Sequence, residues 1–263
     1  MISDQLGSRL SHVSPLRAPT LVLVAHGSRD PRALATVSAL AERIRAYRPG
    51  LTVRLGHIEL NEPLLDDTLA ALPPGRAVLV PLLLSRGHHV KHDIPAAAAA
   101  APHMRTRVAD PLGPHPLLVE ALHDRLVEAG WPERLSAHAR DRTGVVLAAA
   151  GSRDPDAAVD VRRTAALLAH RLGVPVVPGY ASATTPDVAT AVRDLAARGR
   201  DRVAVASYFT APGRFATESA AVAPGIAAAP LGTHPALARL VLHRYDHAPA
   251  TPRRVDLART AAV

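Results

Sequence analysis

The chain has 263 residues, 48% of them hydrophobic, so it can bury a substantial core and is not a wholly disordered protein. It contains no cysteine. This excludes a disulfide scaffold, a thiolate metal site, an iron–sulfur cluster and a cysteine nucleophile, and it is compatible with a reducing cytoplasm.

The formal net charge is +8, but Lys91 is the only lysine and the arginines are spread along the chain. Aromatic residues make up 3%, so the clustered basic stripe and stacking residues of a nucleic-acid binder are missing. Arginine suits carboxylate recognition, which favours an anionic small molecule as partner. The longest apolar run, 77–84, is too short to cross a bilayer, and 1–20 lacks an apolar signal core. We therefore expect a cytoplasmic protein with no membrane partner.

The sequence contains an internal repeat. Residues 21–31 (LVLVAHGSRDP) return at 145–155 (VVLAAAGSRDP), and 111–116 (PLGPHP) return at 230–235 (PLGTHP). Such self-similarity predicts two copies of one unit. The expected organisation is an N-terminal tail, an active unit, a degenerate second unit and a C-terminal tail, over 1–18, 19–138, 139–247 and 248–263.

In the first unit, short apolar runs alternate with longer segments of helical period, a pattern typical of a parallel sheet wrapped by helices. The first helix has Asp30 as a plausible N-cap and Pro31 at its first position. Its apolar stripe is expected to comprise Leu34, Val37, Leu40, Ala41 and Ile44. The predicted strands are 20–25, 51–57, 77–83 and 105–109, and the predicted helices are 31–48, 63–72, 96–101 and 115–129.

The second unit shows the same rhythm. Strands are predicted at 144–149, 174–179 and 202–208, and helices at 155–172, 186–198 and 234–245. The link around 131–143 contains proline and several arginines, which suits an exposed crossing. The expected fold class is α/β, with two tandem units that each form a small parallel sheet with helices on both faces.

Ligands of parallel sheets bind beyond the carboxyl ends of the strands. Three such ends in the first unit lead to His26, Glu59 and His89. Two imidazoles and a carboxylate form a borderline ligand set that accepts divalent iron, cobalt, nickel or zinc. We therefore take these three side chains as candidate metal ligands.

The second unit serves as an internal comparison. Aligning the repeats places Ala150 opposite His26, Ser182 opposite Glu59 and Phe215 opposite His89. The glycines and the Arg-Asp-Pro helix start are retained in both copies, as expected if they serve the backbone. One copy therefore reads as active and the other as structural.

Other polar residues near these positions fit structural roles better. His88 precedes His89 and is expected to point away, whereas His57 lies inside a strand. Glu62 is expected to belong to a helix start, and His92 is a weaker candidate ligand. His115 and His234 recur ahead of equivalent helices, which favours capping or packing. Core packing is likewise favoured for Tyr208, Phe209 and Phe215.

These motifs together resemble the sirohydrochlorin chelatases, grouped as class II chelatases with the cobalt-inserting enzymes of vitamin B12 synthesis. The resemblance rests on AHGSR at 25–29, on Glu59 four residues before Pro63, and on VPLLL leading to GHHV and DIP over 80–95. The resemblance is clear over about 20–130, and it extends to 144–246, where the motifs are degenerate. It implies that the chain inserts Fe²⁺ or Co²⁺ into sirohydrochlorin, a tetrapyrrole with eight carboxylates, in sirohaem or cobalamin biosynthesis.

In this interpretation His26 and His89 deliver the metal and deprotonate the pyrroles, and Glu59 is a ligand or orients an imidazole. The metal is a substrate, and no prosthetic group is implied. We expect a monomer that uses its two halves as a pseudo-dimer. The candidates for binding substrate carboxylates are Arg29, Arg86 and Lys91, with Ser28 either touching the ligand or satisfying backbone donors at the helix start.

Two other functions are compatible with these residues. A divalent-metal carrier or storage protein could use the same three ligands without turnover. A phosphoryl-transfer enzyme could use His26 as nucleophile, but Ala25 stands where the histidine phosphatases carry arginine. No Walker lysine or glycine-rich dinucleotide loop is present, so neither ATP nor NAD is implied.

Overall fold

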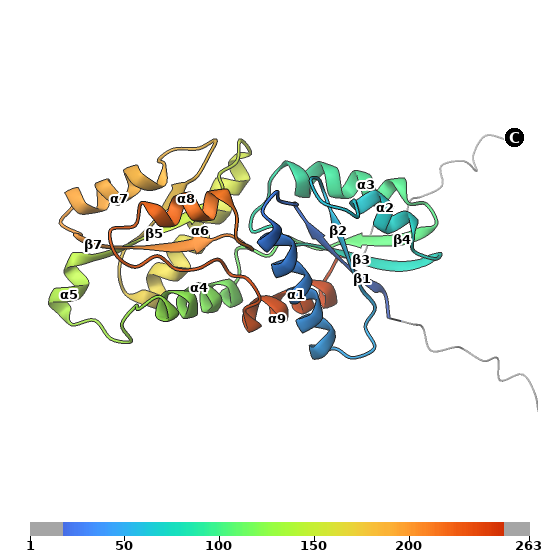
Figure 1. The fold of residues 1–263 in the computed structure, drawn as a ribbon, viewed down its shortest axis with the longest axis horizontal. Coiled ribbons are helices and arrows are strands. Elements are labelled where there is room, and N and C mark those ends of the chain that lie inside the picture. Colours follow the sequence, from blue (N-terminus) through green and yellow to red (C-terminus); the bar gives the residue numbers. More distant parts are fainter. Residues whose placement is uncertain (1–17, 250–263) are drawn as a thin grey trace, which may run out of the picture.

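The computed structural model describes residues 18–249, which form two parallel β-sheets with helices on both sides (Figure 1). The first sheet has the order β2-β1-β3-β4 and the second the order β6-β5-β7. The strands are β1 (Thr20–Ala25), β2 (Val53–His57), β3 (Gly75–Pro81), β4 (Met104–Val108), β5 (Thr143–Ala149), β6 (Val176–Tyr180) and β7 (Arg202–Tyr208). The tandem α/β architecture expected from the repeat is confirmed. The expected tails lie outside the described residues, except for Ala18, Ala248 and Pro249.

The helices begin and end close to the predicted positions, with three additions. Asp30 caps the first helix by accepting from the Arg32 amide, with Pro31 in its first turn, as expected. Asp154 caps the equivalent helix of the second half. The helices are α1 (Pro31–Tyr47), α2 (Leu65–Ala70), the π-helical turn η1 (His89–Asp93), α3 (Ile94–Ala100), α4 (Pro116–Glu128), α5 (Ala137–Arg142), α6 (Pro155–Leu172), α7 (Val188–Ala197), α8 (Arg214–Ala221) and α9 (Pro235–Asp246).

Two expectations about these elements are wrong. Leu34 is 37% exposed, and Ala33 takes its place on the buried stripe of α1. The alanine-rich helix starts at Ile94, because the fixed φ of Pro95 suits a first helical turn rather than the residue before it. The link around 131–143 is mostly exposed, as expected, but it also contains α5, and Trp131 at its start is buried in the core.

Helices cover both faces of each sheet, as the apolar strands require. One large core lies on a shared face and joins residues of β1, β5, α1, α4, α6 and α9. A second core joins β1 and β3 to α2 and α3, and a third joins β5 and β7 to α7. The first core extends through both halves, so they are packed together rather than linked only by the chain.

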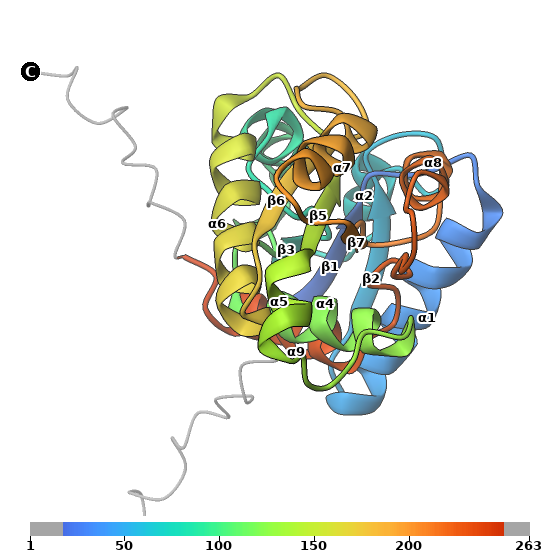
Figure 2. The same cartoon turned by 90° about the vertical axis from the view of Figure 1, so that its left-hand side faces the viewer.

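The last helix of each half packs on the sheet of the other half. Helix α4 contacts β7 and α6, whereas α9 contacts β3 and α1. Figure 1 shows α4 beneath the second sheet and α9 beneath the first, and Figure 2 shows both helices on one side of the sheets. Leu118, Leu122 and Leu126 of α4 are fully buried in this arrangement. The repeat boundary in the sequence therefore does not decide which sheet a terminal helix covers.

Candidate metal site

The loops after β1 and β2 are joined by backbone hydrogen bonds. The Ile58 amide donates to the Ala25 carbonyl at 2.9 Å, and the Glu59 amide donates to the His26 carbonyl at 3.0 Å. These bonds continue the β1–β2 ladder past the strand ends. They place His26 Nδ1 3.6 Å from Glu59 Oε1.

Gly27 permits this close approach. Its φ is +102°, a conformation that side chains disfavour, and a Cβ atom there would lie 1.8 Å from the Glu59 carbonyl oxygen. The glycine of the His-Gly-Ser sequence is therefore required by the backbone. Its consequence for the site is that His26 and Glu59 come from adjacent loops and lie side by side.

His89 completes the group from the third strand end. It is the first residue of η1, and its ring centroid lies 4.8 Å from that of His26, with the ring planes at 85°. The structure thus brings the three predicted residues together in the order His89, His26, Glu59. Within residues 18–249, no three His, Asp or Glu side chains are already arranged to hold a metal ion. Binding a cation here therefore requires side chains such as the exposed Glu59 carboxylate to turn.

Asp93 orients the His89 ring, a role that the sequence analysis missed. His89 Nδ1 lies 2.5 Å from Asp93 Oδ2. Because a carboxylate accepts, Nδ1 is the protonated nitrogen and the Nε2 lone pair remains available to a metal or proton. The one-turn spacing of His89 and Asp93 on a helical segment is the signal that could have indicated the pair. His88 is 72% exposed against 33% for His89, but its Nε2 lies 3.6 Å from the other oxygen of Asp93, so it does not simply point away as expected.

The loop after β1 uses Ser28 to start α1. Its hydroxyl accepts from the Asp30 amide at 3.1 Å, and its own amide donates to Asn61 Oδ1 at 2.7 Å. This is the backbone-satisfying role that the sequence left open. Arg29, three residues after His26 in the same loop, is exposed and forms no ion pair with any described residue.

Arg86 and Lys91 already have carboxylate partners, which the sequence did not reveal. The Arg86 guanidinium pairs with Asp160, and Lys91 Nζ lies 2.8 Å from both Asp154 and Asp156. All three carboxylates belong to the second half. The hydrogen bond from Lys91 lowers the pKa of Asp154 and of Asp156. These cations therefore join the halves instead of facing outward as unpaired charges.

The second half repeats this backbone without the ligands. Gly151 has φ +87°, and a Cβ atom there would lie 1.8 Å from the Ser182 carbonyl oxygen, which matches the relation of Gly27 to Glu59. The Ser182 hydroxyl donates to the Ala150 carbonyl at 2.8 Å. The Phe215 ring lies under the Arg214 guanidinium at 4.5 Å. The equivalent rim therefore has the same shape but no imidazole or carboxylate at these positions.

The remaining candidates have structural roles. His57 is buried, and the Glu62 carboxylate accepts from the Leu64 amide ahead of α2, as expected. His115 and His234 both cap helices, with Nδ1 accepting from Leu117 and Ala236 amides at 3.1 and 3.2 Å. Their recurrence in both copies therefore reflects capping.

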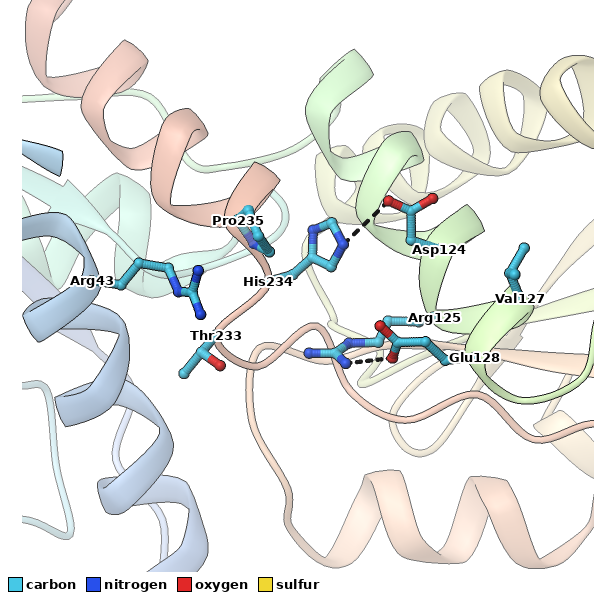
Figure 3. A pocket seen from close by; sticks show the side chains of 8 residues that line it. All are labelled: Arg43, Asp124, Arg125, Val127, Glu128, Thr233, His234 and Pro235. Carbon is cyan, nitrogen blue, oxygen red and sulfur yellow. Dashed lines mark hydrogen bonds and ion pairs between the residues drawn. The ribbon is translucent and has the colours of Figure 1, made fainter. Parts of the chain in front are cut away.

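A cavity of about 540 Å³ lies between α1, α4 and α9 (Figure 3). An ion pair between Arg125 and Glu128 lines it, together with a contact between His234 Nε2 and Asp124 Oδ2 at 3.3 Å. His26, Glu59 and His89 are not among its lining residues. The cavity is therefore separate from the candidate metal site.

In the part of the chain that the structure describes, no helix combines the length and apolarity needed to cross a membrane.

Comparisons with known proteins agree with the motifs. The CbiX family model matches residues 20–129 and 144–248. The sirohydrochlorin ferrochelatase of Bacillus subtilis (strain 168) is 31% identical over 175 residues, which cover 64% of this chain and 64% of that protein. The sirohydrochlorin cobaltochelatase of Priestia megaterium is 29% identical over 198 residues, which cover 72% of this chain and 63% of that protein. The chain thus matches just under two thirds of the length of each of these relatives.

A solved structure, SirB from Bacillus subtilis with Fe³⁺, superposes with a TM-score of 0.70 at 26% identity. The match covers 87% of this chain and 94% of that chain, so it includes both halves. The resemblance indicated by the sequence motifs is confirmed by these matches.

Proposed function

The chain belongs to the CbiX family, and from this premise we propose that it inserts a divalent metal ion, Fe²⁺ or Co²⁺, into sirohydrochlorin. The observation that carries the proposal is the placement of the His26 and His89 rings with centroids 4.8 Å apart, with Glu59 3.6 Å from His26. Imidazole and carboxylate suit both cations. The product would serve sirohaem or cobalamin synthesis.

Insertion requires the metal to lose water and two pyrrole N–H groups to lose protons. The Asp93 carboxylate holds His89 with Nε2 free, so this atom binds the cation or accepts a pyrrole proton. His26 lies between His89 and Glu59 and takes the other role. The Glu59 carboxylate is a ligand or holds the His26 imidazole in the right tautomer.

We propose that Arg29 pairs with a substrate carboxylate, since it is exposed in the same loop as His26 and forms no ion pair with a described residue. Ser28, Arg86 and Lys91 are assigned structural roles, because their side chains already contact other residues of the protein. A single chain is the proposed working unit, because the exchange of α4 and α9 joins the halves within one molecule.

The test is turnover. Purified protein is mixed anaerobically with sirohydrochlorin and Fe²⁺ or Co²⁺, and the absorption of the metallated ring is followed against the uncatalysed rate. Acceleration supports the proposal. Tight binding of Co²⁺ with no acceleration, and with no tetrapyrrole-dependent loss of free metal, would overturn it in favour of a metal carrier.

A further inference from the structure

The segment that carries His89 is contacted by the second half along its length. The Tyr208 hydroxyl donates to the Leu84 carbonyl at 2.8 Å, and Lys91 Nζ donates to Asp154 and Asp156, both at 2.8 Å. Between these points, a Cβ atom on Gly87 would lie 3.6 Å from Ser152 Oγ. The second half therefore contacts residues 84–91 both just before η1 and within it.

The strongest of these contacts joins Arg86 to Asp160. The Arg86 amide donates to Asp160 Oδ2 at 2.9 Å, Nε donates to the same oxygen at 2.9 Å, and Nη2 donates to Oδ1 at 2.7 Å. The Asp160 side chain is only 1% exposed. Moving the loop away would leave this buried carboxylate without its cation, which is costly.

A network of buried hydroxyl groups also links Asp160 to Leu84, which lies in the same segment as Arg86. Thr164 Oγ1 lies 3.1 Å from both the Tyr208 hydroxyl and the Asp160 carbonyl oxygen. Tyr208 and Thr164 are both buried. The position of Leu84 is thus tied to that of α6, which also carries Asp160.

The reverse arrangement is missing from the other loop. By the register of the repeat, Pro212 stands where the first half has Arg86, and Thr217 stands where it has Lys91. Thr36 and Arg32 of α1 occupy the positions of Asp160 and Asp156. Asp30 stands at the position of Asp154, but it pairs with Arg32 of its own half. Only the loop that bears a candidate ligand is therefore held by acidic residues of the opposite half.

We propose that Asp154, Asp156 and Asp160 are positioning residues that hold His89 beside His26, so that the half without ligands orders the half that has them. Their effect on catalysis rests on the proposed chelatase function, whereas their effect on the His89 ring does not. In this proposal the acidic residues hold the loop through their ion pairs with Arg86 and Lys91.

The test uses two variants of the full chain, Asp160→Asn and the double variant Asp154→Asn/Asp156→Asn. Asparagine caps helices as well as aspartate, so the start of α6 is preserved in the double variant. We expect kcat to fall by roughly 10- to 100-fold in Asp160→Asn, as for a small misplacement of a reacting group, with KM for sirohydrochlorin nearly unchanged. If Arg86 and Lys91 bound substrate carboxylates instead, the variants would free them, so that KM would fall and kcat would stay, which contradicts the proposal.

A second readout needs no turnover. In protein with isotope-labelled histidine, the His89 ring signals are identified by their loss in His89→Gln. We expect them to shift or broaden in both variants, while the His115 signals stay. Asp246→Asn is the matched control, because Asp246 forms a bidentate pair with Arg48 between α9 and α1, without contact to 84–91.

Unchanged His89 signals in the folded double variant overturn the positioning role, and this variant decides the matter if Asp160→Asn does not fold. Shifted His89 signals in a protein without chelatase turnover support the positioning role and contradict only the proposed function.

Discussion

The rims of the two halves share a backbone and differ in chemistry. In both, a glycine with positive φ follows the first strand of the half and lies against the carbonyl of the neighbouring loop, Gly27 against Glu59 and Gly151 against Ser182. In both, a serine hydroxyl accepts from the N-cap residue of the next helix, at 3.1 Å. The first rim then presents two imidazoles and a carboxylate, whereas the second presents none at the equivalent positions.

This difference separates what the fold requires from what the chemistry requires. Features kept in both halves are explained by strand ends, helix caps and close backbone contacts. Features found in the first half alone have no such explanation. The second half has its own asymmetric feature, Asp156 and Asp160 of α6, and these face the loop of the first half.

The largest expected effect comes from removing a ligand on the first rim. His26→Ala and His89→Ala are each expected to lower the rate of metal insertion by about 100-fold or more, because each removes a ligand or proton acceptor. Phe215→Ala, at the position equivalent to His89, is expected to change it little. The rate of appearance of the metallated ring is the measurement. Full turnover in both histidine variants would contradict the site assignment.

Because the two rims share a backbone, we expect the two halves to be equally destabilised when a side chain is added at the glycine after the first strand. Gly27→Ala and Gly151→Ala are each expected to lower the free energy of unfolding by about 2 kcal/mol or more, since each adds a backbone clash to an unfavourable φ. Gly50→Ala and Gly199→Ala are controls, since both have positive φ with no atom within 4 Å of the new Cβ. They are expected to cost about 1 kcal/mol. Denaturant unfolding measures all four, and a Gly151→Ala as mild as its control would show that the rims are not equivalent.

The hydrogen bond behind His89 is a further difference between the halves. Asp93→Ala is expected to lower Co²⁺ affinity and turnover by roughly 10-fold, because it frees the His89 ring to rotate. Asp93→Asn is expected to lose less, since its amide oxygen still accepts from Nδ1. Ser219 is the equivalent residue of the second half, and Ser219→Ala is expected to leave Co²⁺ binding intact. Titration with Co²⁺ measures affinity, and an Asp93→Ala protein with wild-type affinity would exclude the orienting role.

The smallest expected effect is a difference between the two capping histidines in how they change the pH dependence of stability. Burial, with Arg244 and His243 nearby, lowers the pKa of His115 to about 4 from 6.5. The unfolded state therefore binds more protons between these values, so stability falls as the pH drops from 6.5 towards 4. Burial also lowers the pKa of His234, but Asp124 opposes it.

His115→Asn keeps a capping side chain and is expected to remove on the order of 1 kcal/mol of this acid destabilisation, with His234→Asn removing less. Unfolding free energies at pH 7 and pH 4.5 measure both. Identical pH dependence of the wild type and His115→Asn would refute the assignment.

Much of the site could be predicted because it depends on local rules. Strand ends in a parallel sheet share one edge, so His26, Glu59 and His89 could be grouped from their positions in the sequence. Asp93 was missed because the prediction started the helix at 96, whereas η1 and α3 form a continuous helical segment from His89. The partners of Arg86 and Lys91 were missed because charges alone do not show which distant carboxylate they meet.

The amino-acid sequence by itself determined the duplication, the strands and most helices, the caps at Asp30 and Asp154, and the three candidate ligands, because each depends on periodicity, spacing or comparison of the copies. Only the tertiary structure decided that α4 and α9 cover each other's sheets and that Asp160 pairs with Arg86. Such contacts join residues far apart in the chain. They are selected by burial and charge compensation across the whole molecule, which no local pattern records.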